Sequence, residues 1–190
     1  MKDTKKMVQL AVLVAIIAIM AFTPLGFLRV GIIEITFMMI PVAVAAIAVG
    51  PAGGAIAGGA FGLTSFLQGF GGSASGVMLM DINPIFFFIL TMVPRILAGW
   101  LPGLIYVAVN KRANKTVAAM AASISAPLFN SILFIGTLLL LFNETALAII
   151  TWMLLVNVLV EAVVGLITGT AVSRSLVHFF PDRKSVIEKG

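Results

Sequence analysis

The fold is decided by residues 40–62, which read IPVAVAAIAVGPAGGAIAGGAFG and contain no charged side chain. A Gly-Pro step divides this stretch into two apolar segments, because glycine and proline are the strongest local breaks in a helical pattern. Four glycines recur at every fourth position and so share one helix face: Gly50, Gly54, Gly58 and Gly62. Glycines at this spacing let the backbone of another helix approach closely. We therefore predict two thin helices packed within the chain.

The rest of the chain is equally apolar. Its 190 residues are 61% hydrophobic and 10% charged, whereas a soluble domain has roughly 45–50% apolar and about 25% charged residues. The 12 basic and 7 acidic side chains are too few to cover the surface of a soluble domain. We exclude a water-soluble enzyme and predict an all-α membrane protein in which residues 1–190 form a single domain.

Gly, Pro or charged residues bound six apolar segments: 7–27, 36–49, 53–67, 84–109, 116–142 and 146–177. A membrane-spanning helix needs about 20 residues, so six transmembrane helices take up about 120 positions and leave about 70 for short loops and tails. No room is left for a nucleotide-binding domain, and no Gly-Lys-Ser or Gly-Lys-Thr sequence ends a phosphate-binding loop. The energy for any transport must come from a partner or from a gradient.

The basic residues predict the orientation of the helices. With six crossings, ten of them lie on one side of the membrane: Lys2, Lys5, Lys6, Lys111, Arg112, Lys115, Arg174, Arg183, Lys184 and Lys189. Of the basic residues in the loops, only Arg29 falls on the other side. Cytoplasmic loops carry the excess of lysine and arginine, so we expect both termini in the cytoplasm and a multi-pass protein of the cell membrane. The net charge of +5 then marks the cytoplasmic face and does not indicate nucleic-acid binding.

Two loops on the outer side are longer than a simple turn requires. Residues 28–35 alternate enough to form a short extended excursion. Residues 68–83 read QGFGGSASGVMLMDIN, and their glycines and serines favour a mobile flap. The two loops indicate a lidded site open to the outside; the alternative is that both are tolerated insertions.

Polar side chains in membrane spans are costly and are usually kept for a reason. Four of them fall at a similar depth: Arg95, Asn130, Asn157 and Glu161. In one interpretation Arg95 pairs with Glu161 and the asparagines form interhelical hydrogen bonds. In the other, which we favour, the four line the floor of a substrate cavity, and Gln68, Asn83 and Asp81 extend a polar path outward.

The sequence favours a transport function over catalysis. It has no cysteine, and its one histidine, His178, lacks an acidic cluster, so we expect no metal site and no cofactor. No serine has a matching base at its depth, so we expect no catalytic residues. A self-sufficient secondary transporter remains the alternative, although no inverted repeat is evident.

Three stretches together resemble a known family. They are Ala11-Val-Leu-Val-Ala15, Glu34-Ile-Thr-Phe-Met-Met-Ile-Pro41 and Val49-Gly50-Pro51-Ala-Gly-Gly-Ala55-Ile. Their order in a chain of six apolar segments resembles the substrate-binding S components of energy-coupling factor (ECF) transporters. The run Asn130-Ser-Ile-Leu-Phe-Ile-Gly136 is similar to members that take pantothenate or related small precursors.

This resemblance implies a mechanism. Family members bind a vitamin with high affinity in an outward cavity built from helices four to six and closed by the first and third loops. They associate in the lipid membrane with a transmembrane coupling protein and two cytoplasmic ATPases, and they topple to deliver the vitamin. Ala11 and Ala15 match the first-helix motif that meets the coupling protein, and residues 68–83 match the gating loop.

The ligand is inferred from the polar residues. Pantothenate is a small anion with hydroxyl and amide groups, which suits one arginine and several carboxamides, so we expect pantothenate. Riboflavin and a pyrimidine or pyridoxine-type precursor are the alternatives.

Overall fold

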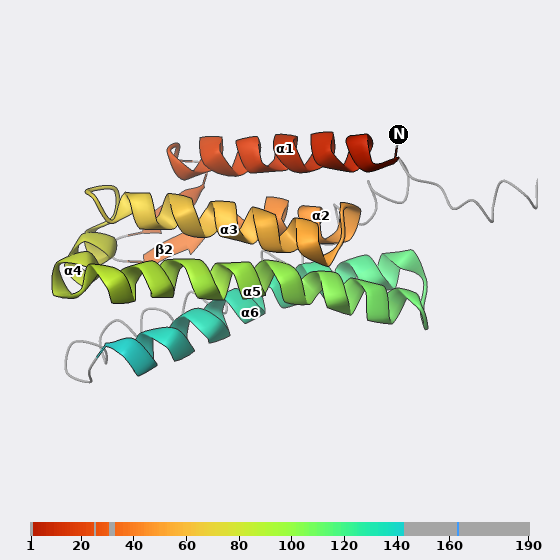
Figure 1. Ribbon diagram of the computed structural model, residues 1–190. Helices are drawn as coiled ribbons and strands as arrows, with labels where there is room; N and C mark the ends of the chain where they lie inside the picture. The colour runs from red at the N-terminus through yellow and green to blue at the C-terminus, as the bar shows by residue number, and fades with distance from the viewer. Residues whose placement is uncertain (1, 25, 31–32, 143–162, 164–190) are drawn as a thin grey trace, which may run out of the picture.

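The computed structural model describes residues 2–24, 26–30, 33–142 and 163. The described part forms six helices and one hairpin: α1 (Lys2–Ala21), β1 (Phe27–Val30), β2 (Ile33–Thr36), α2 (Met39–Ala48), α3 (Pro51–Gln68), α4 (Ala74–Ile82), α5 (Pro84–Asn110) and α6 (Lys115–Leu141). The long helices α1, α3, α5 and α6 run side by side (Figure 1). Contacts join α1 to α3, α3 to α5 and α5 to α6, while α2 touches all four.

Three of these helices are long and apolar enough to cross a membrane. They are residues Thr4–Ala21 of α1 and the whole of α5 and α6. The shorter α2 has 10 residues, seven of them buried, and is only about 15 Å long, half the thickness of the hydrocarbon core. A helix that is apolar all round belongs inside a bundle, and α2 lies there. The predicted segment 146–177 lies outside the described residues.

The glycine face of α3 is confirmed as an internal packing surface. A Cβ atom built on Gly54 would overlap the carbonyl oxygen of Gly99 in α5, and one on Gly58 would overlap that of Arg95. A Cβ on Gly62 would lie 2.7 Å from the carbonyl oxygen of Thr91. The two helices therefore meet backbone to backbone, as the spacing predicts.

Gly50 was wrongly assigned to this face. It precedes α3 as its N-cap with φ of 108°, and a Cβ built there meets nothing within 4 Å. This φ is one that glycine adopts without strain. Pro51 follows at the first helical position, where its missing N–H costs no hydrogen bond. Gly50 therefore turns the chain from α2 into α3 and does not contact α5.

The two longer loops, residues 28–35 and 68–83, differ from each other. Residues 28–35 form the extended excursion that the sequence predicts, because β1 and β2 pair antiparallel with Arg29 opposite Glu34. This hairpin is an addition to a fold that is otherwise helical in the described residues, as predicted. The first predicted segment, residues 7–27, also extends too far. The helix α1 ends at Ala21, before Pro24, and a proline disfavours helix in the residue that precedes it.

The flap predicted at residues 68–83 is largely a helix instead. Ser73 caps α4, its Oγ accepting a hydrogen bond of 3.3 Å from the backbone N–H of Gly76. Leu79 of α4 joins a buried cluster with Phe87, Leu90 and Leu138. A cap at one end and an apolar anchor in the middle order this segment, which composition alone described as mobile.

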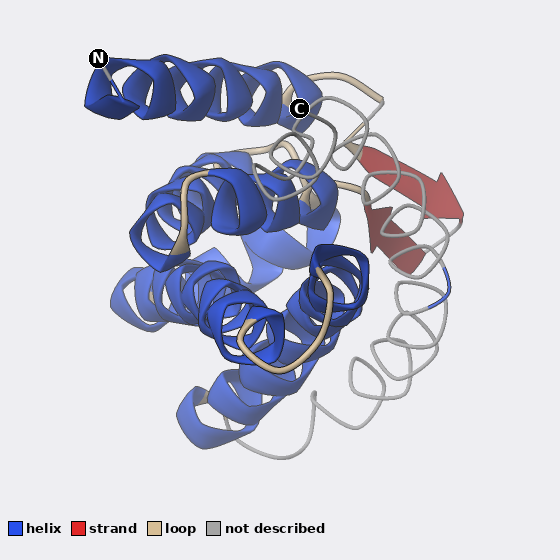
Figure 2. Cartoon of the chain, turned by 90° about the vertical axis from the view of Figure 1, so that its right-hand side faces the viewer, coloured by secondary structure: helices blue, strands red, loops and turns tan. Residues whose placement is uncertain are grey.

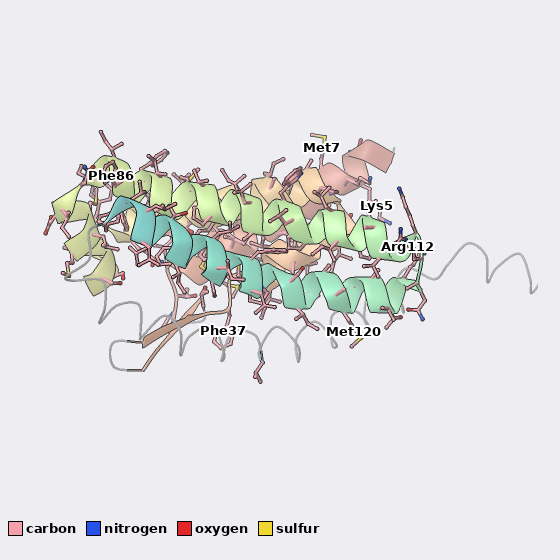
Figure 3. The ribbon with its side chains drawn as sticks, turned by 90° about the horizontal axis from the view of Figure 1, so that it is seen from below. Lys5, Met7, Phe37, Phe86, Arg112 and Met120 are labelled. Atoms are coloured by element: carbon pink, nitrogen blue, oxygen red, sulfur yellow. The ribbon has the colours of Figure 1, made fainter. Side chains whose placement is uncertain are left out.

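The ends of the bundle differ in charge. Lys5 in α1 and Arg112 after α5 lie at one end, and Phe86 lies at the other (Figure 3). The chain start and the turn between α5 and α6 therefore share an end, and the hairpin and α4 lie toward the opposite one (Figure 1).

Candidate functional site

The candidate site is centred on Arg95, which lies in the middle of α5 directly after the buried Pro94. Proline has no N–H, so the carbonyl four residues earlier loses its helical hydrogen bond. That carbonyl belongs to Leu90, and Nη1 of Arg95 donates a hydrogen bond of 2.8 Å to it. The guanidinium is therefore turned back along its own helix.

Two aromatic rings hold the same guanidinium from the neighbouring helices. Its Cζ lies 5.5 Å from the ring centroid of Phe61 in α3 and 4.3 Å from that of Phe134 in α6. A cation over an aromatic face gains about 0.5–1 kcal/mol at an exposed site and about 2 kcal/mol or more when desolvated. The Arg95 side chain thus connects α3, α5 and α6 at one point.

Asn130 presents a polar group one helical turn from Phe134, on the same face of α6. Its side chain is 6% exposed, and its Oδ1 has no hydrogen-bond partner among the described residues. Leaving a buried acceptor unsatisfied costs about 1–3 kcal/mol, and native proteins contain few such groups. The position therefore suits a hydrogen-bond donor that the described chain does not itself supply.

This arrangement combines a fixed cation with a buried acceptor. An arginine guanidinium binds carboxylates with two parallel hydrogen bonds, and a carboxamide oxygen accepts from a hydroxyl or an N–H. Together these two groups fit a small anion that also carries donors.

A family model of the ECF transporter substrate-specific component matches residues 5–172. The chain belongs to this family. A comparison with curated protein sequences gives no match. ECF S components are membrane proteins that bind small-molecule substrates and work with a membrane coupling protein and ATPases. They are transporter subunits and not an enzyme family.

In this S component, two of the predicted site residues make hydrogen bonds that stabilise the fold. Nε2 of Gln68 donates a hydrogen bond of 2.7 Å to the carbonyl oxygen of Ala21, which ties the end of α3 to the end of α1. Asn83 caps α5, and its Oδ1 accepts from the N–H groups of Ile85 at 3.0 Å and Phe86 at 3.1 Å. Asn157 and Glu161 lie outside the described residues, and so does any pairing of Glu161 with Arg95.

Sequence reasoning missed the residues that hold Arg95. Phe61 and Phe134 read as ordinary apolar positions, although Phe134 follows Asn130 by one helical turn and Phe61 lies next to Gly62 of the glycine face. A clearer signal was the Pro94-Arg95 pair inside a span: a proline there releases a carbonyl, and the following arginine supplies donors within reach of it.

The predicted coupling residues lie on a face of α1 that no other described element covers. Ala11 and Ala15 are exposed, together with Val8 and Val12, whereas Ile17 faces the bundle at 0% exposure. Seen along the bundle, α1 lies at its edge (Figure 2). The described residues leave this side of α1 uncovered.

Proposed function

We propose that this chain is the vitamin-binding subunit of an ATP-driven ECF importer and that its substrate is pantothenate. The observation that carries the proposal is the Arg95 guanidinium, which lies over the rings of Phe61 and Phe134, with the buried acceptor of Asn130 one helical turn from Phe134 in α6. Family membership supplies the transport context, and these side chains supply the chemistry of the ligand.

The proposed binding mode assigns one contact to each end of the ligand. The pantothenate carboxylate pairs with Arg95, and a ligand hydroxyl or amide N–H donates to Oδ1 of Asn130. Asn157 and Glu161, which the sequence predicts for the same site, lie outside the described residues. Gln68 and Asn83 shape the entry path beside α4 indirectly, because Gln68 ties the end of α3 to α1 and Asn83 caps the start of α5.

The proposed membrane topology has six spans with both termini in the cytoplasm of a multi-pass cell-membrane protein. The shared end of Lys5 and Arg112 supports it (Figure 3), because the cytoplasmic side carries the basic loops. Residues 146–177 supply the sixth span. The basic end then faces the ATPases, and α4 and the hairpin face outward.

The proposed partner surface is the exposed face of α1. Small side chains let a second helix approach closely, and Ala11 and Ala15 lie there without cover from the described chain. We assign this face to the transmembrane coupling protein, which in turn carries the two ATPases. Lipid surrounds the remaining outer faces.

The first experiment identifies the ligand directly. Mass spectrometry of the small molecule released from the purified chain should find pantothenate, and titration calorimetry should measure its binding. Arg95→Ala should weaken that binding at least 30-fold, or by about 2 kcal/mol, because a buried charge loses its partner. Unchanged affinity in the folded variant would assign Arg95 to packing alone.

A second experiment tests the division of labour between subunits. In liposomes, pantothenate uptake should require the coupling protein, the ATPases and ATP. Uptake by the purified chain alone, driven by an ion gradient, would contradict the proposal and identify a secondary transporter.

A further inference from the structure

Two prolines lie inside α5, Pro94 and Pro102, and both are fully buried. Each removes one N–H from the helix and so releases the carbonyl four residues earlier, which belongs to Leu90 for Pro94 and to Ala98 for Pro102. Only the first of these carbonyls accepts a hydrogen bond from an ionisable side chain within the described residues, the Nη1 bond of Arg95. Both prolines therefore release a backbone carbonyl, but only the carbonyl released by Pro94 accepts a hydrogen bond from Arg95.

The Leu90 carbonyl restricts a rotation of the guanidinium that the two aromatic contacts leave open. Cation–π contacts with Phe61 and Phe134 place the guanidinium over two ring faces but allow it to turn in its own plane. A directed hydrogen bond to a backbone atom sets that rotation, because hydrogen bonds weaken steeply away from linearity. The guanidinium carries five N–H donors, more than this bond uses.

We propose that Pro94 is a positioning residue for the ligand site: by releasing the Leu90 carbonyl, it provides the acceptor that orients the Arg95 guanidinium for a carboxylate ligand. This inference rests on the proposed function of Arg95 as the group that binds the ligand anion. An arginine side chain has a large rotamer entropy, and ordering it before the ligand arrives removes part of the cost of binding. The proline thus acts on affinity through Arg95 without touching the ligand.

The test compares Pro94→Ala with Pro102→Ala as a matched control. Either change returns an N–H to α5 and satisfies the released carbonyl, but only Pro94→Ala gives Leu90 a backbone donor that competes with Arg95. Titration calorimetry is run with pantothenate and with pantothenol, its neutral alcohol analogue. Pro94→Ala should weaken pantothenate binding about five- to tenfold and pantothenol binding less than twofold, while Pro102→Ala should change neither by more than twofold.

A double-mutant cycle separates positioning from general damage to the helix. In the Arg95→Ala background, Pro94→Ala should cause no further loss of pantothenate affinity, because the group that it positions is gone. Equal losses from the two proline variants, or a full Pro94→Ala effect without Arg95, would overturn the inference. Unchanged pantothenate binding in Arg95→Ala alone would instead overturn the proposed function.

A measurement without ligand tests the same coupling. Arg95→Ala should lower the melting temperature of the otherwise native chain, because the Leu90 carbonyl loses its donor in an apolar environment. In the Pro94→Ala background, the restored backbone N–H donates a hydrogen bond to the Leu90 carbonyl. Removing Arg95 should then lower the melting temperature less. Equal decreases in both backgrounds would show that Pro94 and Arg95 act independently and would overturn the inference whatever the ligand is.

Discussion

Two faces of this molecule carry small residues at four-residue spacing and meet opposite environments. On α3, Gly54 and Gly58 lie so close to α5 that an added Cβ would overlap its carbonyl oxygens. On α1, Ala11 and Ala15 are exposed at the edge of the bundle (Figure 2). The same spacing of small residues therefore forms a close helix contact on α3, whereas on α1 it lies on a face that the other described elements leave exposed.

The difference shows what each face is for. Where glycine meets backbone, the contact belongs to the fold, because no side chain can be inserted without moving a whole helix. Where alanine is exposed, we expect a larger side chain to fit in the isolated chain and to affect only the proposed docking of the coupling protein. Substitutions on α3 should therefore change stability, and substitutions on α1 should change association.

The largest effect is expected from Gly58→Ala. The added methyl group would overlap the carbonyl oxygen of Arg95 and force α3 away from α5. Overpacking of this kind costs about 1–3 kcal/mol and sometimes more, and the displaced backbone would also shift the Arg95 guanidinium. We expect a lower melting temperature in a thermal unfolding assay in detergent, together with weaker ligand binding.

Its matched control is Gly59→Ala on the adjacent face of the same helix. A Cβ there would lie 3.6 Å from Cγ1 of Ile96, an ordinary contact. Alanine is favoured over glycine in a helix by about 0.5–1 kcal/mol, so this variant should be as stable as the native chain or more stable. Equal destabilisation by both changes would mean that the α3–α5 contact is not limited by backbone approach.

The next effect concerns the open face. Changing Ala11 and Ala15 together to leucine should leave melting temperature and pantothenate affinity unchanged, because both positions are exposed. Co-purification with the coupling protein should fall at least tenfold, since bulky side chains keep the two helices apart.

A suitable control for the open face is Val12→Leu, which adds one methylene on α1 at a position 53% exposed. This variant should retain complex formation. Loss of ligand binding when Ala11 and Ala15 are both changed to leucine would show that the α1 face is part of the fold after all.

The smallest effect is expected where the two helices are joined. Gln68→Leu removes the hydrogen bond that links α3 to the Ala21 carbonyl of α1. Such a bond contributes about 1 kcal/mol, so we expect a small drop in the melting temperature measured in detergent.

Thr64→Val is its control, since the Thr64 hydroxyl donates only within α3, to the carbonyl of Phe61. If Gln68→Leu destabilises the chain no more than Thr64→Val, the bond between α3 and α1 carries no special weight. α1 would then be held to the bundle by its apolar face alone, around Ile17 and Ala21.

Much of the local structure followed from local signals. The periodic apolar segments predicted α2, α3, α5 and α6 closely, and the short extended excursion predicted at residues 28–35 corresponds to the strands β1 and β2. The missed helix α4 shows the limit of composition, because its glycines and serines hid a Ser73 cap and the apolar anchor Leu79. A cap signal read residue by residue would have found it.

The candidate site was predictable in position but not in arrangement. Depth counting placed Arg95 and Asn130 in the interior, where both lie at least partly buried. It could not show that the guanidinium bonds its own helix or that Gln68 bonds Ala21, 47 residues away. Those contacts depend on which helices are neighbours, and nothing in a one-dimensional pattern states that.

By itself, the sequence determined that this is a helical membrane chain, where most of its helices begin and end, and which small residues permit close packing. These properties are local, because they depend on hydropathy over about 20 residues and on backbone chemistry at single glycines and prolines. Tertiary structure alone decided that α5 covers the α3 stripe, that none of the described elements covers the α1 stripe, and that rings from two helices meet around Arg95. Those outcomes are non-local, because the environment of a side chain is set by whichever distant segment packs against it.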